Sequence, residues 1–266
     1  MAGAEPFTAQ TITWIQPWTP KLFSFRLTRP KGYKFAPGQW ARLGVRKPNL
    51  AQPVWRAYSI VSAHYDDYLE FYSIVVPGGE FTSELAHLHT GDTVLLDNTA
   101  FGFLTTSRFV GGQDLWLLST GTGLAPFISI AFDFDTWERF ERIIFVHGVR
   151  HADELAYADT LAAFKTHETF AEYFEQYPNK LIYQPCITRG AAHDLPLGAL
   201  QGRIPALIES GALETAVGVS LDLARSRVML CGNPDMVQDT RATLKSRGMT
   251  VSRSAAPGQI AVENYW

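Results

Sequence analysis

The chain has 266 residues, of which 46% are hydrophobic and 18% are charged, and its formal net charge is −3. No run approaches the roughly 18 apolar residues that cross a bilayer, and the first residues lack the features of a signal peptide. The two cysteines, Cys186 and Cys231, are too few for a disulfide scaffold or an all-cysteine iron–sulfur cluster. We therefore expect a cytoplasmic protein, not bound to a membrane, with one large or two ordinary domains.

Up to about residue 105, the chain is predicted to consist of short strands separated by tight turns. The β-rich runs lie at 11–14, 22–27, 40–45, 56–61, 68–76 and 93–97. Gly, Pro and Asn punctuate them, and the one helix expected here lies at 82–89. This regular spacing predicts a closed or nearly closed antiparallel β-barrel.

From about residue 111, apolar strands alternate with segments of helical length. The expected strands lie at 115–119, 142–147, 181–188 and 227–231, and the expected helices at 126–135, 153–175, 204–213 and 235–247. Such alternation predicts a parallel sheet covered by helices. We expect two domains, a barrel at 1–105 and an α/β domain at 106–266, with the junction at 101–112.

Positive charge is concentrated near the start of the chain. Between Pro6 and Tyr65 there are nine Lys or Arg residues and no Asp or Glu. Such a stretch can steer an acidic partner, but solvated strand ends would give the same pattern, and both interpretations stay open. No basic helix interleaved with aromatic residues accompanies the charge, so we do not expect a nucleic-acid partner.

Two segments of the predicted barrel contain side chains suited to a flat, phosphorylated ligand. Arg56-Ala57-Tyr58-Ser59 falls on an expected strand, so Arg56 and Tyr58 share one face. An Arg can bind a pyrophosphate through two hydrogen bonds, and a Tyr ring offers a platform for a ring system. Gly78-Gly79-Glu80-Phe81-Thr82 precedes the expected helix, where backbone N–H groups and a hydroxyl can bind phosphate. Each segment alone would also suit an ordinary strand or turn.

Two further motifs follow apolar strands of the α/β half. In Thr120-Gly121-Thr122-Gly123-Leu124-Ala125-Pro126, glycines allow close approach of a ligand, and Pro126 stands where a helix begins. The pattern differs from the standard dinucleotide fingerprint but still favours a nucleotide site. Cys231-Gly232-Asn233-Pro234-Asp235-Met236 ends another strand, at the edge where such sheets bind ligands. Taken alone, Cys231 could equally be a small buried apolar residue.

The last four residues, Glu263-Asn264-Tyr265-Trp266, place two aromatic rings at the end of the sequence. Chain ends usually fray, so two large rings suggest a flat surface that they cover, although a packed terminal strand would also explain them.

In this order, the motifs at 56–59, 120–126, 231–236 and 263–266 resemble those of the ferredoxin–NADP⁺ reductase superfamily along essentially the whole chain. The run at 202–209 and the Tyr265-Trp266 ending are similar to the bacterial branch. The resemblance implies an FAD-binding barrel, an NADP(H)-binding α/β domain and a C-terminal tail that closes over the flavin. It also implies an enzyme that passes a hydride between NADPH and flavin N5 and exchanges single electrons with ferredoxin or flavodoxin.

The resemblance also assigns roles to individual residues. Arg56 would bind the FAD pyrophosphate, Tyr58 would pack on the isoalloxazine, and Ser59 would lie near N5. The residues expected to have catalytic roles are Ser59, Cys231 and Glu263. The expected FAD residues are Arg56, Ala57, Tyr58, Ser59, Gly79, Phe81, Thr82, Tyr265 and Trp266. The expected NADP residues are Thr120, Gly121, Thr122, Gly123, Arg150, Arg189, Arg203, Gly232 and Asp235. No metal site is expected.

Two of these assignments leave alternatives open. Either Tyr265 or Trp266 could cover the isoalloxazine, because the chain has one residue more than relatives that end in Tyr. The preference for NADP rests on Arg150, Arg189 and Arg203, since a 2′-phosphate needs cations where NAD enzymes place a carboxylate. These residues could also be three ordinary surface arginines.

The expected partner is an acidic ferredoxin or flavodoxin, and we expect a monomer. Two other functions remain as alternatives. One is the reductase component of an oxygenase or another flavin reductase, and the other is a non-catalytic flavin-binding sensor. NADH preference would favour the first, and failure of NADPH to reduce the flavin would favour the second.

Overall fold

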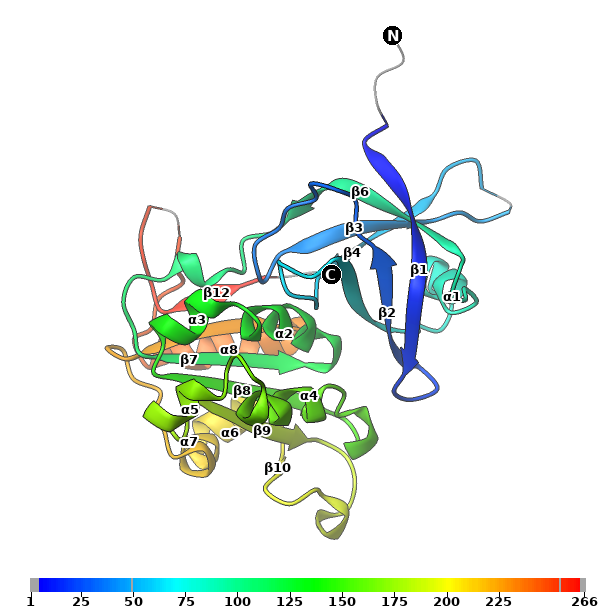
Figure 1. The fold of residues 1–266 in the computed structure, drawn as a ribbon. Helices are drawn as coiled ribbons and strands as arrows, with labels where there is room; N and C mark the ends of the chain where they lie inside the picture. Colours follow the sequence, from blue (N-terminus) through cyan, green and yellow to red (C-terminus); the bar gives the residue numbers. More distant parts are fainter. Residues whose placement is uncertain (1–4, 49, 254, 264–266) are drawn as a thin grey trace.

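The computed structural model describes residues 5–48, 50–253 and 255–263. Two sheets, each from its own half of the chain, lie one above the other (Figure 1). The predicted fold class, an antiparallel β-barrel followed by an α/β domain with a parallel sheet, is confirmed. The exact division at 105/106 stays a prediction, and it falls in the segment between the last barrel strand and the first strand of the second sheet.

The barrel is a six-stranded antiparallel sheet in the order β4-β3-β6-β1-β2-β5. Its strands are β1 (Phe7–Pro17), β2 (Leu22–Thr28), β3 (Trp40–Val45), β4 (Val54–Ser59), β5 (Tyr68–Ile74) and β6 (Thr93–Phe101). Directly after β4, Ile60 forms an antiparallel bridge with Phe71 of β5, which joins the two outer strands. The sheet is therefore closed as the turn pattern predicts.

Alternating side chains of the barrel strands fill its interior. Phe25, Leu43 and Phe71 are among the apolar residues that are almost fully buried there. Helix α1 (Glu80–Leu85) packs Phe81 and Leu85 into the same core. The helix is shorter than expected and begins two residues earlier, because its two apolar residues meet the core within little more than one turn.

The second sheet has six parallel strands in the order β10-β9-β8-β7-β11-β12. They are β7 (Asp114–Thr120), β8 (Arg142–Val149), β9 (Leu181–Ile187), β10 (Leu200–Gln201), β11 (Ser226–Cys231) and β12 (Ile260–Val262). Sequence patterns predicted four of these strands. They missed β10 and β12, which are only two and three residues long and lie at the two edges of the sheet.

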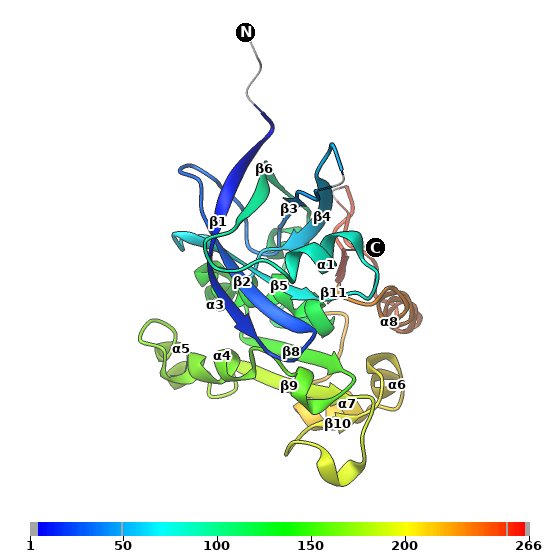
Figure 2. The same cartoon turned by 90° about the vertical axis from the view of Figure 1, so that its right-hand side faces the viewer.

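Helices cover both faces of this sheet. They are α2 (Ala125–Ala131), α3 (Phe134–Arg139), α4 (Ala158–Ala163), α5 (Glu172–Gln176), α6 (Ile204–Glu209), α7 (Ala212–Val217) and α8 (Pro234–Ser246). Because side chains alternate along β7, Leu115 and Leu117 pack with α2 and α3, whereas Trp116 and Leu118 pack with α6 to α8. Figure 2 shows α6 and α8 on one side of the sheet and α4 and α5 on the other.

Two helices that the sequence predicted as continuous are broken. The segment expected at 126–135 is divided into α2 and α3 near Asp133, whose carboxylate accepts a hydrogen bond from the Thr136 hydroxyl. The segment expected at 153–175 contains α4, a short 3₁₀ turn and α5. Phe164 and Phe170 both lie between α4 and α5, and both pack on Trp137. Burial of these rings therefore favours a break over a continuous helix.

The two halves share a continuous apolar contact. The core on the α2 side of the parallel sheet includes Leu22, Val61 and Tyr72 of the barrel half together with Phe127 and Tyr157 of the α/β half. The barrel therefore packs directly against the α/β domain. Within the described residues, no helix is both long enough and apolar enough to cross a membrane.

Candidate functional site

A cleft of about 1040 Å³ lies where the barrel meets the carboxyl ends of β7, β8 and β11. Its volume is at the upper end of the range of ligand pockets, roughly 300–1,000 Å³. Residues predicted from the two halves line this one cleft, although they are far apart in sequence. They are Arg56, Ala57, Tyr58, Ser59, Gly79, Phe81, Thr82, Thr120, Gly121, Thr122, Gly123, Arg150, Arg203, Cys231, Gly232 and Asp235.

The barrel wall of the cleft is built on β4. Arg56 is exposed, and its Nη1 donates to the Trp55 carbonyl at 2.8 Å, so the guanidinium lies along its own strand. Tyr58 is held by a hydrogen bond between its hydroxyl and Ser73 Oγ at 2.9 Å and by its ring contact with Phe81, at 5.3 Å between centroids. Burial raises the pKa of Tyr58 to about 12, so the phenol stays neutral.

The start of α1 adds the second barrel segment. Thr82 Oγ1 accepts a hydrogen bond from the backbone N–H of Val76 at 3.1 Å, which ties the helix to the end of β5. Phe81 is only 1% exposed, and its ring packs against the ring of Tyr58. Gly79 adopts extended backbone geometry directly before the helix. A methyl group on Gly79 would lie 2.7 Å from Thr82 Oγ1, so the turn is closely packed.

The α/β wall consists of two loops in direct contact. Gly123 approaches the other loop so closely that a Cβ there would lie 2.5 Å from the Cys231 carbonyl oxygen. Gly232 has φ +129, and its Cβ would lie 2.4 Å from Thr120 Oγ1. The same Thr120 hydroxyl accepts a hydrogen bond from the Asn233 N–H at 2.8 Å. Only glycine fits at these crossings, so the two motifs form one rigid wall.

A buried histidine supports the first of these loops from behind. His147 of β8 is fully buried, with Nε2 3.1 Å from the Gly121 carbonyl oxygen and Nδ1 3.3 Å from the Tyr183 hydroxyl. Burial lowers the pKa of His147 to about 4, so the ring is neutral at pH 7. The carbonyl requires a proton on Nε2, and Nδ1 then accepts from Tyr183. The sequence motifs did not identify His147, because this single histidine belongs to none of them.

Cys231 ends β11 and is fully buried at the base of the cleft. Burial raises the pKa of its thiol well above the usual range, and the nearby Glu263 carboxylate acts in the same direction. The group is therefore a neutral thiol, not a thiolate nucleophile. Next to it, Asn233 caps α8 by accepting hydrogen bonds from the N–H groups of Asp235 and Met236 at 2.9 and 3.2 Å.

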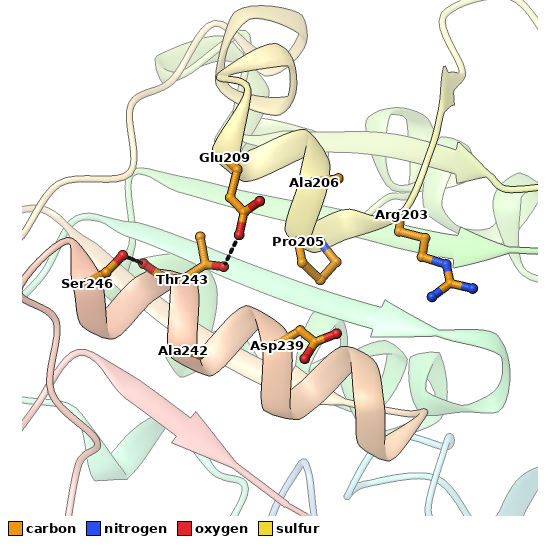
Figure 3. A pocket seen from close by; sticks show the side chains of 8 residues that line it. All are labelled: Arg203, Pro205, Ala206, Glu209, Asp239, Ala242, Thr243 and Ser246. Carbon is orange, nitrogen blue, oxygen red and sulfur yellow. Dashed lines mark hydrogen bonds between the residues drawn. The ribbon is translucent and has the colours of Figure 1, made fainter.

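The three predicted arginines differ in their surroundings. Arg150 lines the cleft and pairs with Glu154, with Nη2 to Oε1 at 2.7 Å. Arg203 lines the cleft and also the end of an adjoining groove of about 490 Å³ between α6 and α8, opposite Asp239 (Figure 3). Arg189 is not among the residues lining the cleft, but its backbone N–H donates to the Arg150 carbonyl at 2.8 Å. The loops that bear Arg150 and Arg189 are therefore adjacent.

Glu263 joins the end of the described chain to the barrel. Its Oε1 accepts a hydrogen bond from Trp40 Nε1 at 2.9 Å, while β12 just before it pairs with β11. Glu263 is not among the residues that line the cleft, and Tyr265 and Trp266 lie outside the described residues. Throughout the described ranges, no cluster of three or more His, Cys, Asp or Glu residues could hold a metal ion.

The donor set of the cleft fits a flavin on one wall and a phosphorylated nucleotide on the other. The chain also matches two family models in this order: the oxidoreductase FAD-binding domain over residues 17–99 and the oxidoreductase NAD-binding domain over residues 117–242. The fold and the cleft thus define a flavin- and nicotinamide-dependent oxidoreductase.

Individual relatives are similar over nearly the whole chain. The chain is 41% identical to ferredoxin–NADP reductase A of Sorangium cellulosum, across 97% of this chain and 89% of the relative. It is 38% identical to the flavodoxin/ferredoxin–NADP reductase of Escherichia coli, across 96% and 97%. The structure of a ferredoxin NADP⁺ reductase from Neisseria gonorrhoeae with bound FAD and NADP matches with a TM-score of 0.88 and 38% identity, across 98% and 99%. The chain belongs to the ferredoxin–NADP reductase family.

Proposed function

We propose that this protein is an FAD-dependent reductase that exchanges electrons between NADP(H) and a ferredoxin or flavodoxin. When bound, the two cofactors supply the redox chemistry, in which a hydride passes between nicotinamide C4 and flavin N5 and single electrons pass between the flavin and the carrier. The observation that carries the proposal is the single cleft, which brings strand side chains of the barrel opposite the glycine loops of the α/β domain.

The barrel wall would hold FAD. Arg56 would bind the pyrophosphate, and Tyr58, with Ala57 beside it, would support the isoalloxazine. Ser59 would present its hydroxyl near N5. The turn from Gly79 to Thr82 would approach the phosphates through its backbone, with Phe81 fixing the turn in the barrel core.

The α/β wall would hold NADP(H). The loop Thr120 to Gly123 and the backbone around Gly232 and Asp235 would approach the nucleotide, as their shared packing supports. Arg150, Arg203 and the adjacent Arg189 would supply positive charge for the 2′-phosphate.

The neutral thiol of Cys231 suits a group that borders the nicotinamide without reacting with it. Glu263 would act at the edge of the site, with its carboxylate oriented by Trp40. We also propose that the terminal Tyr265 and Trp266 close over the flavin, and that the domains divide at 105/106.

The positive charge of the basic stretch at 6–65 supports an acidic carrier as the partner. Ion pairs within the protein neutralise part of this charge. Arg26 pairs with Glu70 at 2.8 Å, Lys47 with Glu84 at 3.6 Å, and Arg42 with Asp97 at 3.9 Å. We therefore expect moderate steering of a carrier rather than a strong uniform field. We further propose that the protein is a cytoplasmic monomer, a location that suits two buried free thiols.

Anaerobic stopped-flow spectroscopy tests the function. NADPH should bleach the bound flavin faster than NADH does, and mixing with reduced or oxidised ferredoxin and flavodoxin should then move electrons to or from the flavin. Faster reduction by NADH, with no exchange with either carrier, would instead indicate a reductase of another system. A flavin that NADPH does not bleach would indicate a binding module.

The assignment of the arginines is tested through coenzyme preference. Arg203→Ala should weaken NADPH use by about tenfold while leaving NADH use within twofold, because a hydrogen bond to a charged group contributes roughly 1.5–3 kcal/mol. Steady-state KM values for both coenzymes measure this, and Arg241→Ala on α8, which does not line the cleft, is the matched control. Equal losses with both coenzymes would contradict the role.

A further inference from the structure

Tyr157 belongs to the α/β domain, but its side chain is buried against the barrel, at the contact between the two domains. It immediately precedes α4 and is 5% exposed. Its hydroxyl donates to Glu70 Oε1 of β5 at 2.8 Å and is also hydrogen-bonded to Ser24 Oγ of β2. Both partners come from the other domain.

Four barrel residues, Trp18, Ser24, Glu70 and Tyr72, form a socket around this side chain. The Tyr157 ring lies 5.0 Å from the Trp18 ring and 5.4 Å from the Tyr72 ring, between centroids. The Trp18 indole Nε1 donates to Ser24 Oγ at 2.9 Å. Glu70 is fixed in turn by Arg26, with Nε to Oε2 at 2.8 Å.

The hydrogen bonds of the socket can run in only one direction. Glu70, as a carboxylate, only accepts, so Tyr157 must donate its proton to it. Ser24 then donates to the Tyr157 oxygen, and Trp18 donates to Ser24. Burial and the Glu70 carboxylate raise the pKa of Tyr157 well above its usual range, so the phenol keeps this proton. Each donor in this series of hydrogen bonds has one acceptor, so the side chains of the socket have a single arrangement around Tyr157.

The backbone of Tyr157 is also unusual. Its φ is +61, and among the described residues it is the only non-glycine residue with a positive φ. This conformation is disfavoured for a bulky side chain and persists only where surrounding contacts hold it. The socket supplies those contacts. Their stabilising free energy therefore exceeds the cost of the unfavourable φ at Tyr157.

The socket lies directly behind the cleft. Tyr72, which contacts Tyr157, also lines the cleft. Three residues before Tyr157, Glu154 lines the cleft as well and holds Arg150. On a different strand of the barrel, the hydrogen bond between Trp40 and Glu263 is another polar contact between the domains, and the Ser129 hydroxyl of α2 donates to the Ser62 carbonyl at 2.8 Å.

We propose that Tyr157 is a positioning residue that fixes the α/β domain on the barrel and thereby sets the distance between nicotinamide and flavin. This inference rests on the proposed function. The two walls of the cleft belong to different domains, so the reacting atoms meet correctly only if the domains do not slide. Reacting atoms must approach to about 3–3.5 Å, and a displacement of 1 Å can cost about a hundredfold in rate.

Tyr157→Phe in the FAD-loaded enzyme is the central test, because it keeps the ring and removes only the hydroxyl. Single-turnover flavin reduction by NADPH should slow by about tenfold or more. The dissociation constants of FAD and NADP⁺ should change by less than about twofold, because no group that touches either ligand is lost. The deuterium isotope effect with NADPH labelled at C4 should become more temperature-dependent, since the donor–acceptor distance is less well fixed.

Electron exchange with a carrier provides an internal control, because it does not involve nicotinamide and should be unchanged. Tyr173→Phe is the matched variant. Its ring packs on Trp137 inside the α/β domain, and it should leave all these rates unchanged. Ser24→Ala removes one of the two hydrogen bonds of the Tyr157 hydroxyl from the barrel side, and the double variant with Tyr157→Phe should be little slower than Tyr157→Phe alone. Ser24→Ala also carries the test if Tyr157→Phe does not fold.

A readout without turnover separates this inference from the proposed function. In the variant, amide hydrogen exchange should increase in β2, β5 and the segment 150–163, with no nucleotide present. Unchanged exchange, an unchanged isotope effect or strictly multiplicative effects of the two substitutions would overturn the positioning role. If wild-type flavin is not reduced by NADPH but exchange increases as expected, the proposed function fails and the domain contact stands.

Discussion

The two walls of the cleft are built in different ways. The barrel wall presents side chains from a strand, so that Arg56 and Tyr58 point to one face through the period of the strand itself. The α/β wall presents backbone from two loops, where Gly123 and Gly232 cross so closely that no Cβ fits. A side-chain wall can be altered one group at a time, whereas a backbone wall should fail as a unit.

Gly232→Ala should give the largest effect, because it adds a side chain where the two loops of the α/β wall cross. Its Cβ would lie 2.4 Å from Thr120 Oγ1 and 2.7 Å from the Thr120 carbonyl oxygen, at a φ of +129. We expect a loss of roughly 3–5 kcal/mol, seen as loss of NADP⁺ binding and a lower Tm. Gly218→Ala, with φ +71 and open space around it, is the control for backbone strain alone. If Gly232→Ala bound NADP⁺ like the wild type, the wall would not be rigid.

Acidification should destabilise the α/β wall as well, because His147 supports its first loop. Its pKa is about 4 in the folded protein and near 6.5 when unfolded, so below pH 6.5 only the unfolded state gains the proton. Stability is complete above pH 6.5 and falls by roughly 3 kcal/mol as the pH drops to 4. Urea unfolding across this range should show a steeper loss in the wild type than in His147→Gln. Identical pH slopes for the two proteins would show that His147 titrates normally in the fold.

Arg56→Ala should be milder, because it removes one group of the side-chain wall. The residue is exposed and bonds only to its own strand, so Tm should stay within about a degree. FAD affinity should fall by about tenfold to a hundredfold, which corresponds to a hydrogen bond to a charged group of roughly 1.5–3 kcal/mol. Fluorescence titration of the apoprotein with FAD measures this. Arg42→Ala on the neighbouring strand, outside the cleft, should bind FAD normally.

Tyr58→Phe should have the smallest effect. It keeps the ring contact with Phe81 and loses only the bond to Ser73, which is worth about 1 kcal/mol. The flavin spectrum should be unchanged and Tm should fall by a few degrees. Tyr58→Ala removes the ring as well and should loosen FAD, which separates the hydroxyl from the platform. A large spectral change in Tyr58→Phe would mean that the hydroxyl itself contacts the isoalloxazine.

The sequence could predict what depends on local pattern. Strand periodicity and glycine turns predicted the barrel and four of the six parallel strands, although not the short edge strands β10 and β12. Motifs at strand ends identified both cleft walls, because parallel strands bring their carboxyl ends to one edge. The contributions of His147 and Tyr157 could not be predicted this way. Each acts through a partner that is 26 or more residues away, and the single residues carry no motif. The break after α4 was also missed, because it depends on aromatic packing around Trp137. The break after α2, near Asp133 and its bond to Thr136, was missed as well.

The order of strands in the parallel sheet also bears on how the chain folds during synthesis. β7 is the first strand of that sheet to leave the ribosome, yet one of its two neighbours is β11, and the Thr120–Asn233 bond spans 113 residues. Until β11 is made, one edge of a strongly apolar strand is unpaired and open to aggregation or to a chaperone. The nucleotide loop lacks its second half for the same period. Nucleotide binding by nascent chains would therefore report the moment at which the sheet closes.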